Sequence, residues 1–166
     1  MSNDQQNYTE VDCVRDTLVH IRQFQDNLTL ALNDLIEEMK DHDQSKFTEE
    51  ELKAFTEVTP KLRKLEYGSV EYKDNLKLLN DALKHHYESN RHHPEHFKEG
   101  ISGMTLMDLV AMICDWWAAT RRHETGDIRK SIRINRDRFG YGEDLEQIFL
   151  NTIERLETQS KRTNHH

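Results

Sequence analysis

The sequence contains few residues that break helices or crosslink chains. Its 166 residues include 6 Gly, 2 Pro and 2 Cys. So few turn-forming residues exclude a many-stranded sheet, and the abundance of Leu, Glu, Lys, Asp and Ala favours an all-α fold in a single domain. Cys13 and Cys114 lie far apart within helical patterns. This placement predicts buried free thiols in a reducing compartment.

Long apolar runs and an excess of positive charge are also absent. The first eight residues are polar, and no apolar run approaches the length needed to cross a membrane. We therefore expect a cytoplasmic protein without membrane contact. The net charge of −8 opposes bulk binding of nucleic acid. A small phosphorylated molecule is a compatible partner, because a local basic patch suffices to bind it.

Apolar residues recur at helical spacing through most of the chain. We expect a flexible segment over residues 1–10, one helical domain over 11–158 and a flexible polar tail over 159–166 that includes His165 and His166. Pro60 and Gly68-Ser69 interrupt the pattern, and Pro94 can start a short helix inside a loop. The predicted helices span residues 11–40 (one helix or a closely joined pair), 48–56, 70–87, 106–123 and 144–158.

Histidines and aspartates form an ordered set along this helical pattern. His20 precedes the dipeptide His42-Asp43, which falls at a helix end. Five of the ten histidines follow between His85 and His96, and Asp115 lies in a strongly apolar helix. An unpaired carboxylate among apolar neighbours costs several kcal/mol of desolvation, which a bound cation offsets. The set therefore predicts a centre for one or two divalent metal ions.

Each member also has a simpler reading: His42-Asp43 alone resembles an ordinary polar turn, and a lone helical histidine such as His20 commonly bonds a backbone carbonyl. The density of histidines favours ligation. Helical phase points His86 rather than His85 toward the core, whereas the phase of the following loop is not fixed by the sequence. The predicted ligands are His20, His42, Asp43, His86, His92 and Asp115, with His85 and His93 as alternates. Asp43 is the natural bridging ligand if two ions bind. Mn, Co, Ni, Fe, Zn and Mg all remain open as the metal.

Charged residues near these ligands are candidates for contacts with substrate. Lys46 and Arg91 can hold phosphate oxygens, Lys46 as a point charge and Arg91 as a fork, and Arg121 is a further candidate. Glu95, or Glu88, can hold the outer nitrogen of a ligating histidine. Asp43, Lys46 and Glu95 are therefore the predicted catalytic residues, with Asp43 or an outer acid carrying a proton.

The order H…HD…H…H…D resembles that of the HD superfamily of metal-dependent phosphohydrolases over roughly residues 17–120. Residues His42 to Lys46 read as a variant of its HDxGK motif. The chain is also similar to a family of small phage and bacterial proteins with HDxSKF and HH…NxHHPE motifs, matched by His42 to Phe47 and His85 to Glu95. The resemblance implies an HD-type helical bundle that hydrolyses a nucleotide or another small phosphate ester through metal-activated water, in the host cytoplasm if the protein is phage-encoded.

Two other functions fit the same residues. Some HD-fold proteins carry two irons and oxidise small substrates with dioxygen, and histidine with carboxylate ligands suits iron too. A non-catalytic helical protein with a structural metal, or none, is the third reading. The sequence leaves the substrate, the metal and the oligomeric state open.

Overall fold

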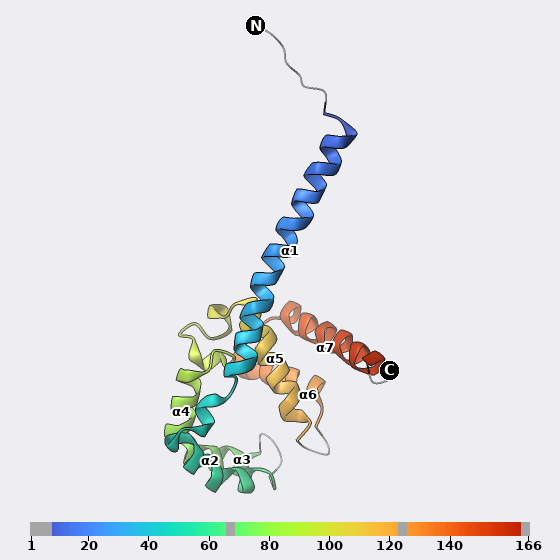
Figure 1. Ribbon diagram of the computed structural model, residues 1–166. Helices are drawn as coiled ribbons and strands as arrows, with labels where there is room; N and C mark the ends of the chain where they lie inside the picture. The colour runs from blue at the N-terminus through green and yellow to red at the C-terminus, as the bar shows by residue number, and fades with distance from the viewer. Residues whose placement is uncertain (1–7, 66–68, 123–125, 164–166) are drawn as a thin grey trace. The chain divides into compact units, whose positions relative to one another are not determined.

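A computed structural model describes residues 8–65, 69–122 and 126–163, and it confirms the all-α fold class (Figure 1). No strand occurs among these residues. Within the same ranges, no helix combines the length and the apolar character required to cross a membrane. The α-helices are α1 (Glu10–Asp41), α2 (Glu49–Leu62), α3 (Val70–Leu76), α4 (Asn80–Ser89), α5 (Leu106–Thr120), α6 (Ile128–Phe139) and α7 (Glu143–Thr163). Short 3₁₀ helices are η1 (Gln44–Phe47), η2 (Lys77–Leu79), η3 (Pro94–His96) and η4 (Gly100–Gly103).

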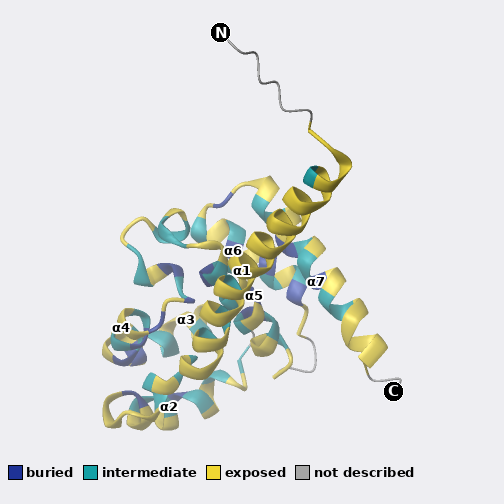
Figure 2. Ribbon diagram, turned by 45° about the horizontal axis from the view of Figure 1, so that its top comes forward, coloured by how far each residue is buried: buried dark blue, intermediate teal, exposed yellow. Residues whose placement is uncertain are grey.

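The chain divides into two compact units, residues 1–40 and 41–166. The division falls next to Asp41, the last residue of α1. The first unit consists of α1, one unbroken helix of 32 residues. A single helix cannot cover its own apolar stripe, and α1 is exposed along most of its length (Figure 2).

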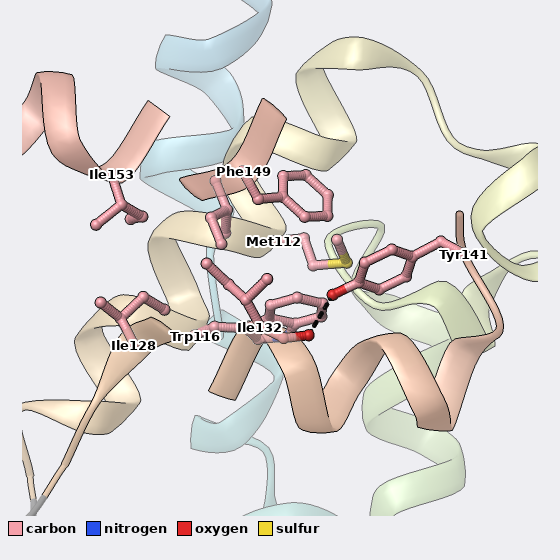
Figure 3. Close-up of a cluster of buried hydrophobic side chains, with 8 residues drawn as sticks. Met112, Trp116, Ile128, Ile132, Tyr141, Phe149 and Ile153 are labelled. Carbon is pink, nitrogen blue, oxygen red and sulfur yellow. Dashed lines mark hydrogen bonds between the residues drawn. The ribbon is translucent and has the colours of Figure 1, made fainter. Parts of the chain in front are cut away.

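The hydrophobic core of the second unit is built from α5, α6 and α7 (Figure 3). Met112, Ile132 and Ile153 are completely buried in it. The Tyr141 hydroxyl donates a hydrogen bond to the Ile132 carbonyl, so the one polar group of that ring is satisfied inside the core. We refer to the following residues as the apolar core: Met112, Ile113, Trp116, Ile128, Ile132, Tyr141, Phe149 and Ile153.

Helix α6 was absent from the sequence-based prediction, yet its local signals are present. The Asp127 side chain accepts hydrogen bonds from the Arg129 and Lys130 amides and caps the helix start. Gly140 ends it in the left-handed conformation, with φ 69°. The buried positions Ile128 and Ile132 are spaced by one turn. Numerous charged residues between them lowered the apolar signal, and that is why the pattern was overlooked.

Several predicted boundaries move in the structure. Helix α2 continues through Pro60 to Leu62, beyond the expected end at residue 56. A 3₁₀ turn separates α3 from α4 within the segment expected as one helix, and Ser69 caps α3. Helix α7 extends to Thr163, into the predicted flexible tail. Gly68, His123, His165 and His166 lie outside the described residues.

Both cysteines are free, as expected, but the prediction that they are buried was wrong. Cys13 and Cys114 are exposed. The helical period explains Cys114, because it follows the buried residues Met112 and Ile113 of α5 and so points away from the apolar core.

Candidate metal centre

The turn between residues 41 and 49 sets the direction of the Asp43 carboxylate. Asp43 has φ 60° and ψ 11°, the left-handed conformation that Asp tolerates better than most residues. Its carbonyl accepts a hydrogen bond from the Lys46 amide at 3.0 Å, which opens the 3₁₀ helix η1. The Lys46 ammonium folds back onto Asp43 Oδ2. The HDxSKF motif is therefore a tight turn that holds one carboxylate at a fixed angle.

Asn90 connects this turn to the histidine-rich loop that follows α4. Its amide group donates to the His86 carbonyl at 2.7 Å and to Ser45 Oγ at 2.8 Å. Asn90 is 5% exposed, so these bonds are made away from water, where an unpaired amide would be costly. Ser45 of the first motif and Asn90 of the second are thus structural partners, and their contact brings the two motifs together.

Four side chains from these motifs converge: Asp43, His86, His92 and His93 each offer a ligand atom within 4.8 Å of the others. His86 Nε2 lies 3.0 Å from His93 Nε2 and 3.3 Å from Asp43 Oδ1, and His92 Nε2 lies 3.6 Å from the same oxygen. Ligands about 2.1 Å from one ion are about 3.0 to 3.4 Å apart in octahedral or tetrahedral arrangements. These three distances are close to that spacing, so the four atoms form a group that could hold one divalent cation.

Two atoms of this group, Asp43 Oδ1 and His92 Nε2, are buried without a hydrogen-bond partner. Buried polar atoms nearly always have a partner, because the desolvation cost of leaving them unpaired is about 1 to 3 kcal/mol each. Both atoms face the same cluster. A cation bound between them would satisfy both, so the residues present fit a metal ion.

The protonation states of the cluster also suit ligation, which requires neutral imidazole and ionised carboxylate. Burial, helped by the neighbouring His92 and His86 rings, lowers the pKa of His93 to about 2. Burial and the Lys46 charge likewise lower the pKa of His86. Burial alone would raise the pKa of Asp43, but His92 and the Lys46 ammonium outweigh it and hold that pKa below its ordinary value.

A second group shares Asp43. His42, Asp43 and Asp115 also have ligand atoms within 4.8 Å of one another. His42 Nε2 lies 3.5 Å from Asp43 Oδ2 and 3.7 Å from Asp115 Oδ1. Asp115 projects from α5, whose opposite residues belong to the apolar core. The two oxygens of Asp43 thus face different groups, the arrangement expected of a carboxylate that bridges two ions.

Glu51, rather than the predicted Glu95 or Glu88, contacts the outer nitrogen of His86. Its side chain is completely buried, and Oε2 lies 3.0 Å from His86 Nδ1 while Oε1 lies 2.7 Å from His85 Nδ1. A carboxylate that accepts a hydrogen bond from His86 Nδ1 leaves Nε2 with its lone pair toward the cluster, the tautomer that a metal ligand requires. The hydrogen bond between His85 Nδ1 and Glu51 raises the pKa of His85.

Glu51 was overlooked because its place in the first turn of α2 had an adequate explanation, the helix dipole. One signal was available. Glu51 lies seven residues before the buried Val58, so the two share the inward face of the helix. A carboxylate on an inward face needs a partner, and the nearby histidines could have supplied it.

Other predicted site residues have partners elsewhere in the structure. Nε and Nη2 of Arg91 donate hydrogen bonds to the Asp108 carboxylate, each at 3.1 Å. The guanidinium carbon of Arg121 lies 4.2 Å from the centroid of the Trp117 ring. The Glu95 carboxylate accepts from Arg138 at 2.6 Å. His20 lies on α1 in the other unit, and its role as a ligand stays a prediction.

Comparison with known proteins identifies the family of the chain without a function. A family model matches residues 9–162, so the chain belongs to DUF5662, a family of unknown function. No curated protein matches it. No solved structure matches it either.

Proposed function

We propose that the protein is a metal-dependent phosphohydrolase of the HD type, which acts on a nucleotide or another small organic phosphate ester. One observation carries the proposal: Asp43 belongs to two groups of potential ligands, and the buried atoms Asp43 Oδ1 and His92 Nε2 lack any other partner. A cluster that needs cations and contains both nitrogen and oxygen donors supports a divalent metal centre.

The roles follow from the two groups. His86, His92, His93 and Asp43 would hold one ion, and His42 and Asp115, together with Asp43, a second. Such ions supply Lewis acidity toward a phosphoryl oxygen and make water a nucleophile at neutral pH. His42 and Asp115 are partly open, with side chains 36% and 22% exposed, so substrate and water can approach from their side. The second group therefore faces the reaction, and the buried first group anchors it.

Lys46 supplies the charge that recognises phosphate. Its ammonium neutralises Asp43 in the protein described here, and its side chain is 33% exposed. Once ions compensate Asp43, the lysine becomes available to donate to a phosphoryl oxygen, since it lies beside the same carboxylate. A charge-assisted hydrogen bond of this kind contributes about 1.5 to 3 kcal/mol. In a chain with a net charge of −8, such a local cation matters more for a small anion than for a long polyanion.

The proposal is tested by loading the purified protein with Mn, Co, Ni, Fe, Zn or Mg and measuring phosphate or pyrophosphate release from mono-, di- and triphosphates and from cyclic nucleotides. Asp43→Ala should abolish both tight metal binding and turnover, with kcat/KM reduced at least about a thousandfold, since metal catalysis contributes several kcal/mol. Asp41→Ala is the matched control, because Asp41 is exposed two residues earlier. It should bind metal and turn over substrate normally.

Three results would contradict the proposal. Full metal occupancy in Asp43→Ala would remove Asp43 from the centre. A fully metallated protein without turnover of any phosphate ester would favour a non-catalytic metal-binding role. Consumption of dioxygen by the iron-loaded protein, coupled to oxidation of a small molecule, would favour an oxygenase.

A further inference from the structure

Residues 41–166 form a partly open cavity of about 550 Å³ beside the candidate metal centre. Its walls come from α2, α3, α4, α5, α6 and the 3₁₀ turns η1 and η2, and most of the wall surface is apolar. We call it the Phe55 cavity. Side chains that line it include Phe55, Leu62, Leu79, Leu83, Trp116 and Ile134. Its volume lies within the range of about 300 to 1,000 Å³ typical of sites for organic ligands, and greatly exceeds the space that a phosphate group needs.

Three residues of the cavity wall also touch the metal centre. Lys46 lines the cavity and forms the ion pair with Asp43. The centroids of the Phe55 and His86 rings are 5.9 Å apart, and those of the Tyr87 and His93 rings are 5.0 Å apart. The cavity and the ligand cluster are therefore neighbouring compartments separated by single side chains. A molecule with its phosphate at Lys46 has the cavity directly beside it.

The charged residues of the cavity are mostly basic, in contrast to the acidic chain as a whole. Lining cations are Lys46, Arg63, Arg122, Lys130 and Arg138, and the lining carboxylate among the described residues is Asp127. Asp127 already caps α6 through hydrogen bonds from two backbone amides. Lys46 and Arg138 are paired with Asp43 and Glu95. Arg63, Arg122 and Lys130 still outnumber Asp127 in a wall with much apolar surface, which suits an anion that has an apolar body.

From this combination we infer that the substrate is an organic phosphate whose non-phosphate part is aromatic or otherwise apolar, and that this part binds in the Phe55 cavity. The inference rests on the proposed function and narrows it. It excludes inorganic polyphosphates and small polyol phosphates as preferred substrates. A nucleobase on its sugar, an aryl group and a short hydrocarbon chain each satisfy it, because the wall offers rings and aliphatic side chains for an apolar body. Polar side chains of the same wall, among them Thr59, Thr120, Ser131 and Asn135, can bond polar edges of that body.

Binding of two non-hydrolysable phosphonates tests the inference without relying on turnover. Manganese-loaded protein is titrated with 1-naphthylmethylphosphonate and with methylphosphonate by isothermal calorimetry at several temperatures. The naphthyl compound should bind at least about tenfold more tightly, since the added ring leaves water for an apolar site. Its binding should also show the more negative heat-capacity change, the mark of apolar burial.

Filling the cavity should remove this preference. Ile134→Trp and Leu62→Trp place a large side chain in the cavity from two different helices, and Ile148→Trp is the control because Ile148 is 57% exposed on α7. The affinity ratio between the two phosphonates should fall toward one in either cavity variant and stay unchanged in the control. Thermal melts identify a variant that does not fold. If one cavity variant does not fold, the affinity ratio measured with the other cavity variant tests the inference.

The outcomes separate the inference from the proposed function. Equal affinity for both phosphonates in the native protein would overturn the inference and leave the phosphohydrolase proposal standing. A preference that survives in both folded cavity variants would also overturn it, because the ring would then bind elsewhere. Metal-loaded protein that binds neither phosphonate would overturn both.

Discussion

The apolar core and the cluster of Asp43, His86, His92 and His93 lie in the same unit, but they differ in whether their buried polar atoms have hydrogen-bond partners. In the apolar core, Ile132 and Ile153 are completely buried and the one internal hydroxyl, on Tyr141, has an acceptor. In the cluster, Asp43 Oδ1 and His92 Nε2 are buried without one. Removal of apolar surface from water makes the first region stable by itself. The two unpartnered atoms of the second cost free energy, which is the observation behind the proposed metal centre.

Helix α5 belongs to both regions, which explains how the costly cluster keeps its shape. Met112 and Trp116 pack into the apolar core, whereas Asp115 reaches the second group of ligands. A capping box between Thr105 and Asp108 fixes the start of the helix, and Arg91 holds the same Asp108 carboxylate. Asp115 therefore projects from a helix whose position is determined by the apolar core. Ligands on rigid elements are held more accurately than ligands on loops.

The largest effect expected on stability comes from the core side of this comparison. Ile132→Ala leaves a cavity between α5, α6 and α7 and should lower the free energy of unfolding by about 3 kcal/mol. Chemical denaturation with and without metal measures it, and the loss should be the same in both. The exposed Ile148→Ala should change stability by less than about 0.5 kcal/mol. A loss of metal affinity in folded Ile132→Ala would show that the apolar core and the cluster are energetically coupled.

A smaller effect is expected when the support of the cluster is changed and its ligands are kept. Glu51→Gln preserves the shape of the side chain but removes the charge that holds the His86 Nδ1 proton. Metal affinity should fall about tenfold to a hundredfold, the usual effect of an outer partner. Competition with a chromophoric chelator measures this affinity. Glu57→Gln, an exposed change on the same helix, should have no effect. Unaltered metal affinity in Glu51→Gln would show that Glu51 contributes only packing.

Helical periodicity predicted much of the fold because it reports which side chains face a common core. It located α1, α5 and α7 and, through the phase of α4, pointed His86 inward, where it is 2% exposed. It did not find α6, whose sequence is dominated by charged residues. The extension of α2 through Pro60 was not predicted, because an interior proline removes a helix hydrogen bond and therefore indicates a helix end, whereas α2 continues for two residues beyond it.

The sequence indicates which residues belong to the candidate metal centre, but not which side chains contact the residues around it. Residue type and order indicated Asp43, His86, His92 and Asp115, which the structure brings into two adjoining groups. The partners of Arg91 and Glu95 depend on contacts 17 and 43 residues away in sequence. No local pattern reports such contacts. The same limit hid Glu51, whose role exists only because α2 packs against α4.

The smallest effect expected is a pH dependence confined to the cluster. The pKa of His93, about 2, means that its ring stays neutral in the folded, metal-free protein, whereas an unfolded imidazole takes up a proton near pH 6.5. The lowered pKa of His86 acts in the same direction. The unfolded state therefore binds more protons as the pH falls, and stability must fall with it. Each ring contributes at most about 1.4 kcal/mol per pH unit between about pH 6 and pH 5.

Other groups near the cluster do not change this slope. His85 has a raised pKa, so its contribution to stability is already complete between pH 6 and pH 5 and adds no slope. Asp43, with a lowered pKa, loses its contribution only at lower pH. Denaturation with a chelator present should show this slope, and His93→Gln should reduce it. Stability that is constant or increases on acidification over the same range would mean that these imidazoles are protonated in the folded protein, and the contrast between a self-sufficient core and a cluster of neutral ligands would fail.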